Sequence, residues 1–351
     1  MIQAWEYPKR SNLSATDRDT TSEGFMDFSN RAIKTPVLAL TNHKGGVGKS
    51  TLAQLLSFFF TRVLGMRVLA FDLDPQGNYS ASMIEMDDRP QFNHPADSPL
   101  AMYPNSVNPP DHPMYGHPYS MYETLVEGVL MPYATRVDGL ELVPSTGLLS
   151  SYDMMYAGDL YRLDEILNDP ENLELINSYD LIIIDTPPAV DTCSQNANFA
   201  ATHILVPMLL ERKSMDGISA TRALNAMRES HTQRDYSLRL IPNQVDRRMG
   251  VHQDVLKELK DSPVYKELLL SEIPHRASIK DLDMIGANPF SPDGLSPNDP
   301  LRKIWTKFGI EVATWIGFDE QVKSLKKTER ARQELNIHAA TKRTKKTVQG
   351  A

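Results

Sequence analysis

A glycine-rich loop between two apolar segments constrains the fold of this chain more than any other feature. The run Val37–Leu40 is continuously apolar, as in a buried parallel strand, and residues 52–64 form an apolar-rich helical stretch. Between them the sequence reads Lys44-Gly45-Gly46-Val47-Gly48-Lys49-Ser50-Thr51. Strand, glycine loop and helix in this order predict a phosphate-binding loop at the edge of an α/β sheet.

The residue types of this loop explain how it would hold a chain of phosphates. Its glycines let successive backbone N–H groups face the phosphates, and the helix that starts near Lys49 adds free N–H groups and a positive end. We expect Lys49 to reach the β- and γ-phosphates and the Ser50 hydroxyl to ligate Mg²⁺. The loop residues predicted to bind a nucleotide are Lys44, Gly45, Gly46, Val47, Gly48, Lys49, Ser50 and Thr51.

Lys44 is a lysine that the ordinary loop pattern does not require, and His43 stands where that pattern has its first glycine. With this lysine the loop resembles the deviant Walker A motif of the ParA/MinD family of P-loop ATPases. Residues 67–78, with the core Asp72-Leu73-Asp74-Pro75-Gln76-Gly77, resemble the second strand and switch I of that family. Residues 181–188, Leu-Ile-Ile-Ile-Asp-Thr-Pro-Pro, resemble its Walker B strand and switch II. The resemblance extends from about residue 35 to about residue 316.

The motifs assign a role to three further side chains. Asp185 ends an apolar strand at the edge where α/β proteins bind ligands, so we expect it to hold Mg²⁺ through water beside Ser50. The resemblance implies that Asp74 orients the attacking water, and Asp72 is interpreted as structural. It also implies that Lys44 reaches across a nucleotide-sandwich dimer to the phosphates of the other subunit, as an arginine finger does. The predicted catalytic residues are therefore Lys44, Lys49 and Asp74, the cofactors ATP and Mg²⁺, and the active form an ATP-dependent homodimer.

The order of the remaining segments predicts an α/β fold, with a mostly parallel sheet flanked by helices on both faces. Further strands are expected at residues 140–144, 204–207, 238–241 and 269–273, and helices at 160–167, 214–229, 251–259 and 300–316. Asn243 follows one of these strands at the ligand edge. The resemblance implies that it contacts adenine, while a turn-capping role is an open alternative.

Composition is that of a cytoplasmic α/β protein. The chain has 351 residues, of which 41% are hydrophobic, and we find neither an apolar run long enough to span a membrane nor a signal-peptide pattern. Its single cysteine, Cys193, excludes an internal disulfide framework. One cysteine per chain also excludes the bridging cluster of the related nitrogenase iron protein, to which each subunit supplies two.

Three regions are distinguished along the chain. Residues 1–34 are a polar extension, and residues 35–318 are the ATPase domain, with a proline-rich insertion at about 86–119. The basic tail, 319–351, has nine basic and two acidic side chains from Lys323 onward, a formal charge of +7. Because the whole chain carries −8, the remainder carries −15. Such a tail predicts a polyanionic partner, although a solvated tail without a partner is an alternative.

The tail contains few apolar residues, so nonspecific DNA is favoured over a membrane as its partner. The residues predicted to contact DNA are Arg247, Arg248, Arg276, Lys280, Lys342, Arg343, Lys345 and Lys346. By its resemblance, the chain is expected to be a nucleoid-associated DNA segregation ATPase. It would dimerise on ATP, bind DNA and be released when a ParB-type centromere-binding protein stimulates hydrolysis. The alternatives are a MinD-like membrane regulator, a ParA-like system that positions a protein assembly, and a P-loop metabolic ligase or kinase.

Overall fold

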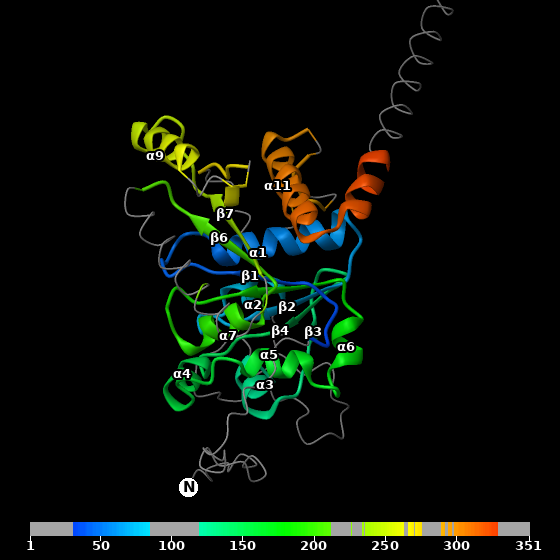
Figure 1. Ribbon diagram of the computed structural model, residues 1–351. Helices are drawn as coiled ribbons and strands as arrows, with labels where there is room; N and C mark the ends of the chain where they lie inside the picture. Colours follow the sequence, from blue (N-terminus) through cyan, green and yellow to red (C-terminus); the bar gives the residue numbers. More distant parts are fainter. Residues whose placement is uncertain are drawn as a thin grey trace, which may run out of the picture.

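The computed structural model describes residues 31–84, 119–211, 226, 234, 236–262, 266–269, 271–275, 289–291, 294–296 and 298–328. Within these residues the chain forms a seven-stranded sheet in the order β3-β4-β2-β5-β1-β6-β7, with helices packed on both faces (Figure 1). All neighbouring strands are parallel except β3 and β4. The predicted fold class is therefore confirmed. The strands are β1 Val37–Leu40, β2 Val68–Asp72, β3 Tyr133–Ala134, β4 Leu140–Val143, β5 Leu181–Asp185, β6 His203–Met208 and β7 Ser237–Pro242.

Helices lie between these strands and after the last of them. They are α1 Lys49–Phe58, the π-helix η1 Phe59–Val63, α2 Asn78–Met83, α3 Met121–Glu127, α4 Leu149–Met155, α5 Arg162–Asn168, α6 Leu173–Asn177, α7 Thr192–Ala200, α9 Gly250–Asp261 and α11 Pro300–Ile316.

The two faces of the sheet have separate cores because side chains alternate along a strand. Leu38 and Leu40 of β1 belong to the core with α1, η1 and α11. Val37 and Ala39 belong to the core with α3, α5, α7 and α9. The central strands β1, β2 and β5 are buried along their whole length, which explains why they read as continuous apolar runs.

Several expected elements differ from those observed. The strand expected at 269–273 is replaced by isolated bridges, Leu240 with Leu268 and Val245 with Pro274. Of the helix expected at 214–229, only Ala226 is described, and it is helical. Residues 1–30, 85–118 and 329–351 lie outside the described part, and with them most of the extension, the insertion and the tail. Residues 319–328 are helical, and Val322 is buried against the core. None of the described helices is both long and apolar enough to cross a bilayer.

Helix α11 closes one core and is well defined by its sequence. Asp299 caps its amino terminus by accepting from the Leu301 N–H at 2.7 Å, Pro300 occupies the first turn, and Gly317 ends it with φ of 107°. In its middle, Gly309 faces Phe59 of η1 so closely that a Cβ would lie 2.4 Å from the ring. The absence of a side chain here lets α11 pack directly on the helix that follows the phosphate loop.

The substitution Gly309→Ala is expected to destabilise the protein. Alanine favours a helix by about 1 kcal/mol over glycine, but overpacking a core typically costs about 1–3 kcal/mol, and the close ring leaves little room to relax. Urea unfolding followed by circular dichroism measures the change. The matched control is Gly250→Ala in α9, where nothing lies within 4 Å of the new Cβ, and it should be neutral or stabilising. Equal stability of the two variants would contradict the packing of α11 on η1.

Candidate functional site

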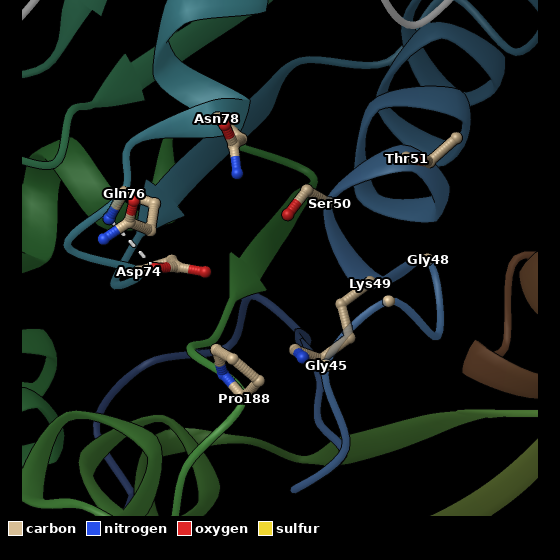
Figure 2. Close-up of a pocket in the computed structure, with 10 residues that line it drawn as sticks. Gly45, Gly48, Lys49, Ser50, Thr51, Asp74, Gln76, Asn78 and Pro188 are labelled. Atoms are coloured by element: carbon tan, nitrogen blue, oxygen red, sulfur yellow. Dashed lines mark hydrogen bonds between the residues drawn. The ribbon is translucent and has the colours of Figure 1, made fainter. Parts of the chain in front are cut away.

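A cavity of about 520 Å³ lies where the strands β1, β2 and β5 end. The phosphate loop forms one wall, and the segments after β2 and β5 form the other (Figure 2). This is the edge at which a parallel sheet binds ligands. The residues that line the cavity are Gly45, Gly46, Gly48, Lys49, Ser50, Thr51, Asp74, Gln76, Asn78 and Pro188.

The loop has the backbone geometry that its glycines predict. Gly46 and Gly48 adopt φ of 71° and 89°, in the left-handed region, and α1 begins at Lys49 directly after them. Asn42 accepts from the Lys44 N–H at 2.9 Å and donates to the Pro207 carbonyl at 2.6 Å. The start of the loop is thereby fixed to β6.

A second support comes from the end of β7. The Asn243 Nδ2 donates to the Val47 carbonyl at 2.7 Å, and the Gln244 Nε2 donates to the Gly46 carbonyl at 2.7 Å. Gln244 has φ of 54°, a left-handed value rare outside glycine. A Cβ on Gly48 would lie 2.3 Å from the Asn243 Nδ2, so this glycine also makes room for the support. Asn243 therefore holds the phosphate loop, and its predicted contact with adenine stays a prediction.

The buried groups in and beneath the cavity wall carry more negative than positive charge. Asp72, Asp74 and Asp185 are buried together with Lys49, and the register of β2 and β5 places Asp72 opposite Asp185. Burial raises the pKa of the Asp72 carboxyl to about 7, against hydrogen bonds from Ser80 that lower it. Burial and then the neighbouring Asp72 raise the pKa of Asp185. Burial also lowers the pKa of Lys49, while Asp185 and Asp74 oppose that shift.

Asp185 has the properties of a cation ligand. Both carboxylate oxygens are buried and lack a hydrogen-bond partner among the described residues. Buried carboxylate oxygens without a partner are costly, and a divalent cation near them compensates the charge. The described residues contain no group of three or more His, Cys, Asp or Glu side chains arranged to hold a metal. One buried carboxylate beside the Ser50 hydroxyl fits Mg²⁺, which keeps several waters and binds through one or two protein groups together with phosphates.

Asp74 and Ser50 point into the cavity from opposite walls (Figure 2). The Asp74 Oδ1 accepts from the Gln76 N–H at 3.0 Å, and burial raises the pKa of this carboxyl. Thr51 lies on the next position of α1 and points away from Asp74. Gln76, Asn78 and Pro188 also line the cavity. They lie in or beside the two switch motifs, which is the signal that would have identified them.

Lys44 has a different environment from Lys49. Its side chain is 48% exposed and makes an ion pair with Glu211, with 2.5 Å between Lys44 Nζ and Glu211 Oε2. Among the described residues, those that line the cavity include Lys49 but not Lys44. The side chain of the second lysine therefore lies outside the lining of the cavity and pairs with Glu211.

The basic residues predicted to contact DNA are only partly described. Arg247 pairs with Glu272 at 2.9 Å and Arg248 with Asp246 at 2.7 Å, and both arginines are exposed. Arg276, Lys280, Lys342, Arg343, Lys345 and Lys346 lie outside the described residues.

Comparison with known proteins gives consistent matches. Residues 35–239, more than half of the chain, match the model of a family described as AAA domain. The chain is 31% identical over 224 residues to the chromosome-partitioning ATPase Soj of Thermus thermophilus, a match that covers 64% of this chain and 75% of that protein. It is 27% identical to the sporulation initiation inhibitor protein Soj of Bacillus subtilis, covering 68% of this chain and 87% of that protein.

A likeness to solved structures supports the fold. A plasmid partition protein from Borrelia burgdorferi B31 bound to AMPPNP has a TM-score of 0.59 at 18% identity, covering 80% of this chain and 99% of that chain. At these identities the likeness shows the fold alone.

The support from β7 gives a prediction for Asn243→Ala. The buried Val47 carbonyl would lose its donor, which costs about 1–3 kcal/mol, or roughly 5- to 150-fold in affinity. Because the effect is on the loop, binding of ATP and of inorganic tripolyphosphate should weaken by the same factor in calorimetric titrations. The control is Gln253→Ala, which removes an exposed amide that donates to the Arg247 carbonyl. It should change neither the affinity for ATP nor that for tripolyphosphate. A loss confined to ATP would instead mean that Asn243 contacts adenine.

Proposed function

This chain belongs to the ParA/MinD family of partition ATPases, and we propose that it is a DNA segregation ATPase driven by an ATP-dependent dimer. In this cycle the protein binds ATP and Mg²⁺, dimerises and associates with nonspecific DNA. A partner protein of the ParB type, which binds a centromere-like site, then stimulates hydrolysis. Hydrolysis releases the ATPase from the DNA. The protein would act in the cytoplasm on the nucleoid.

The cavity provides the groups that nucleotide binding requires. The loop amides and Lys49 would hold the β- and γ-phosphates, and Ser50 with Asp185, the latter through water, would hold Mg²⁺. When bound, the cation neutralises phosphate charge beside the buried carboxylates. Asp74 points into the same cavity, which supports its proposed role of orienting the water that attacks the γ-phosphate.

The observation that carries the proposal is the position of Lys44. A lysine that served its own phosphate site would line the cavity, as Lys49 does, whereas Lys44 does not line it and is half exposed. An exposed ion pair such as Lys44 with Glu211 contributes only about 0.2–1 kcal/mol. Lys44 can therefore leave Glu211 and reach the phosphates of a second copy, where its charge would stabilise the transition state.

DNA binding would depend on the dimer because two subunits double the number of phosphate contacts. Arg247 and Arg248 are exposed, and their acidic neighbours, Glu272 and Asp246, leave much of each guanidinium accessible. The part of the basic tail from Lys323 onward adds a formal charge of +7 per subunit. Contacts to phosphates are indifferent to base sequence and weaken as salt rises. The cargo of such a dimer could be a plasmid, a chromosome or a protein assembly.

Co-sedimentation tests this proposal with the full-length protein. We expect binding to nonspecific DNA in the presence of ATP and Mg²⁺, loss of binding without ATP, and weaker binding at higher salt. Vesicles of anionic lipid should not bind the protein. Binding to vesicles but not to DNA would contradict the proposal and favour a MinD-like membrane regulator.

Lys44→Ala is the variant for the same assay. It should bind ATP but remain monomeric by analytical ultracentrifugation and fail to sediment with DNA, because the charge supplied across the dimer is lost. Hydrolysis should fall by about 10³-fold, the lower end for a cation supplied by a second subunit. The control is Lys307→Ala, which removes an exposed lysine paired with Glu311 on α11 and should behave as wild type. Unchanged dimerisation of Lys44→Ala would refute the role of Lys44.

A further inference from the structure

Asp74 is held from behind by buried side chains that do not line the cavity. The Asp74 N–H donates to the Asp72 Oδ1 at 3.1 Å, and the Asp74 carbonyl accepts from the Ser145 hydroxyl at 2.5 Å. Ser80 links these two residues. Its N–H and hydroxyl donate to the Asp72 Oδ2 at 2.8 and 2.7 Å, and its oxygen accepts from the Ser145 N–H at 3.0 Å.

These hydrogen bonds close a ring of four residues, Asp72, Asp74, Ser145 and Ser80. Asp72 ends β2, Ser80 lies on α2, and Ser145 follows β4, so the ring joins three separate elements. Asp72 and Ser80 have no exposed surface, and Ser145 is 1% exposed. Such a network is rigid because each member is satisfied and shielded from water.

The ring matters because of where Asp74 is in the chain. Asp74 lies beyond the end of β2 and precedes Pro75, so no strand hydrogen bonds hold its backbone. Its carbonyl accepts from the Gly77 N–H at 2.9 Å, within the local turn, and from Ser145, 71 residues away. The Ser145 hydroxyl is thus the contact by which the neighbouring strand fixes the turn that carries the carboxylate.

We propose that Ser145 is a positioning residue for ATP hydrolysis, which holds the Asp74 turn so that its carboxylate meets the attacking water. The inference rests on the proposed role of Asp74. Ser145 itself touches no nucleotide, because it is buried behind the cavity wall. Its loss should therefore affect the chemical step and leave nucleotide binding intact, since a small misplacement of a catalytic group lowers the rate much more than the affinity.

The test is the steady-state hydrolysis of ATP by Ser145→Ala, with nucleotide affinity measured separately by titration. We expect kcat to fall by about tenfold or more, with the KM for ATP and the affinity for a non-hydrolysable analogue close to those of wild type. Ser145→Thr keeps the hydroxyl and should recover most of kcat. A wild-type kcat in Ser145→Ala, or an equal loss of affinity and kcat, would overturn the proposal.

A buried hydroxyl elsewhere provides the matched control. Thr35 lies beside the amino-terminal end of β1, at the opposite edge of the sheet, and its hydroxyl donates to the carbonyls of Ile176 and Tyr179 at 3.1 and 3.0 Å. Thr35→Val should lower thermal stability without changing kcat. If Ser145→Ala does not fold, Ser145→Cys takes its place because its larger thiol leaves no cavity and is a weaker hydrogen-bond donor. A wild-type kcat in that variant would overturn the proposal equally.

Asp74→Asn separates failure of this inference from failure of the proposed function. If Asp74→Asn hydrolyses ATP as wild type does, the catalytic role of Asp74 is wrong, and the inference falls with it. If Asp74→Asn is inactive while Ser145→Ala keeps its kcat, only the role of Ser145 is wrong. If Ser145 acts through the Asp74 carboxylate, the double variant Ser145→Ala with Asp74→Asn should be no slower than Asp74→Asn alone.

Discussion

The unequal charge at one edge of the sheet is the constraint on which the rest of the site depends. Within the described part of the chain, Asp72, Asp74 and Asp185 are buried with a single ammonium group, that of Lys49. An uncompensated buried carboxylate is unfavourable, so burial raises the pKa of these groups in the free protein. Asp72 is satisfied by hydrogen bonds, whereas Asp185 has oxygens without a described partner. The site is therefore suited to a divalent cation. Its phosphate loop is suited to the phosphate chain that binds together with such a cation.

The fold creates this edge and also supports it from both sides. Parallel strands bring their carboxyl ends together, which places the phosphate loop after β1 on one side of both switch segments, which follow β5 and β2. Beyond one side of the site, Asn243 after β7 holds the loop, and on the other, Ser145 after β4 holds the Asp74 turn. The binding groups and the group proposed for hydrolysis thus have separate supports. Changes in one can be distinguished from changes in the other by comparing affinity with rate.

Much of this arrangement could be predicted from the sequence, because it is encoded locally. The strand, loop and helix around Lys49 are consecutive in the chain, and Asp185 ends an apolar run that is itself a strand signal. The supports could not be predicted. Asn243 contacts a loop 196 residues away, and Ser145 contacts Asp74 across 71 residues, so only the strand order brings them together. The ion pair between Lys44 and Glu211 could not be predicted for the same reason, because 167 residues separate its two members.

The central claim is that Lys44 acts on the nucleotide bound by the other subunit, whereas Asp74 acts on the nucleotide bound by its own subunit. Mixing two inactive variants, Lys44→Ala and Asp74→Asn, tests it most directly through the rate of ATP hydrolysis. A mixed dimer then contains one site with both residues, formed by Asp74 of the first variant and Lys44 of the second. We predict that the mixture hydrolyses ATP although neither variant does so alone. A mixture as inactive as its components, at concentrations where mixed dimers are detected, would contradict the account.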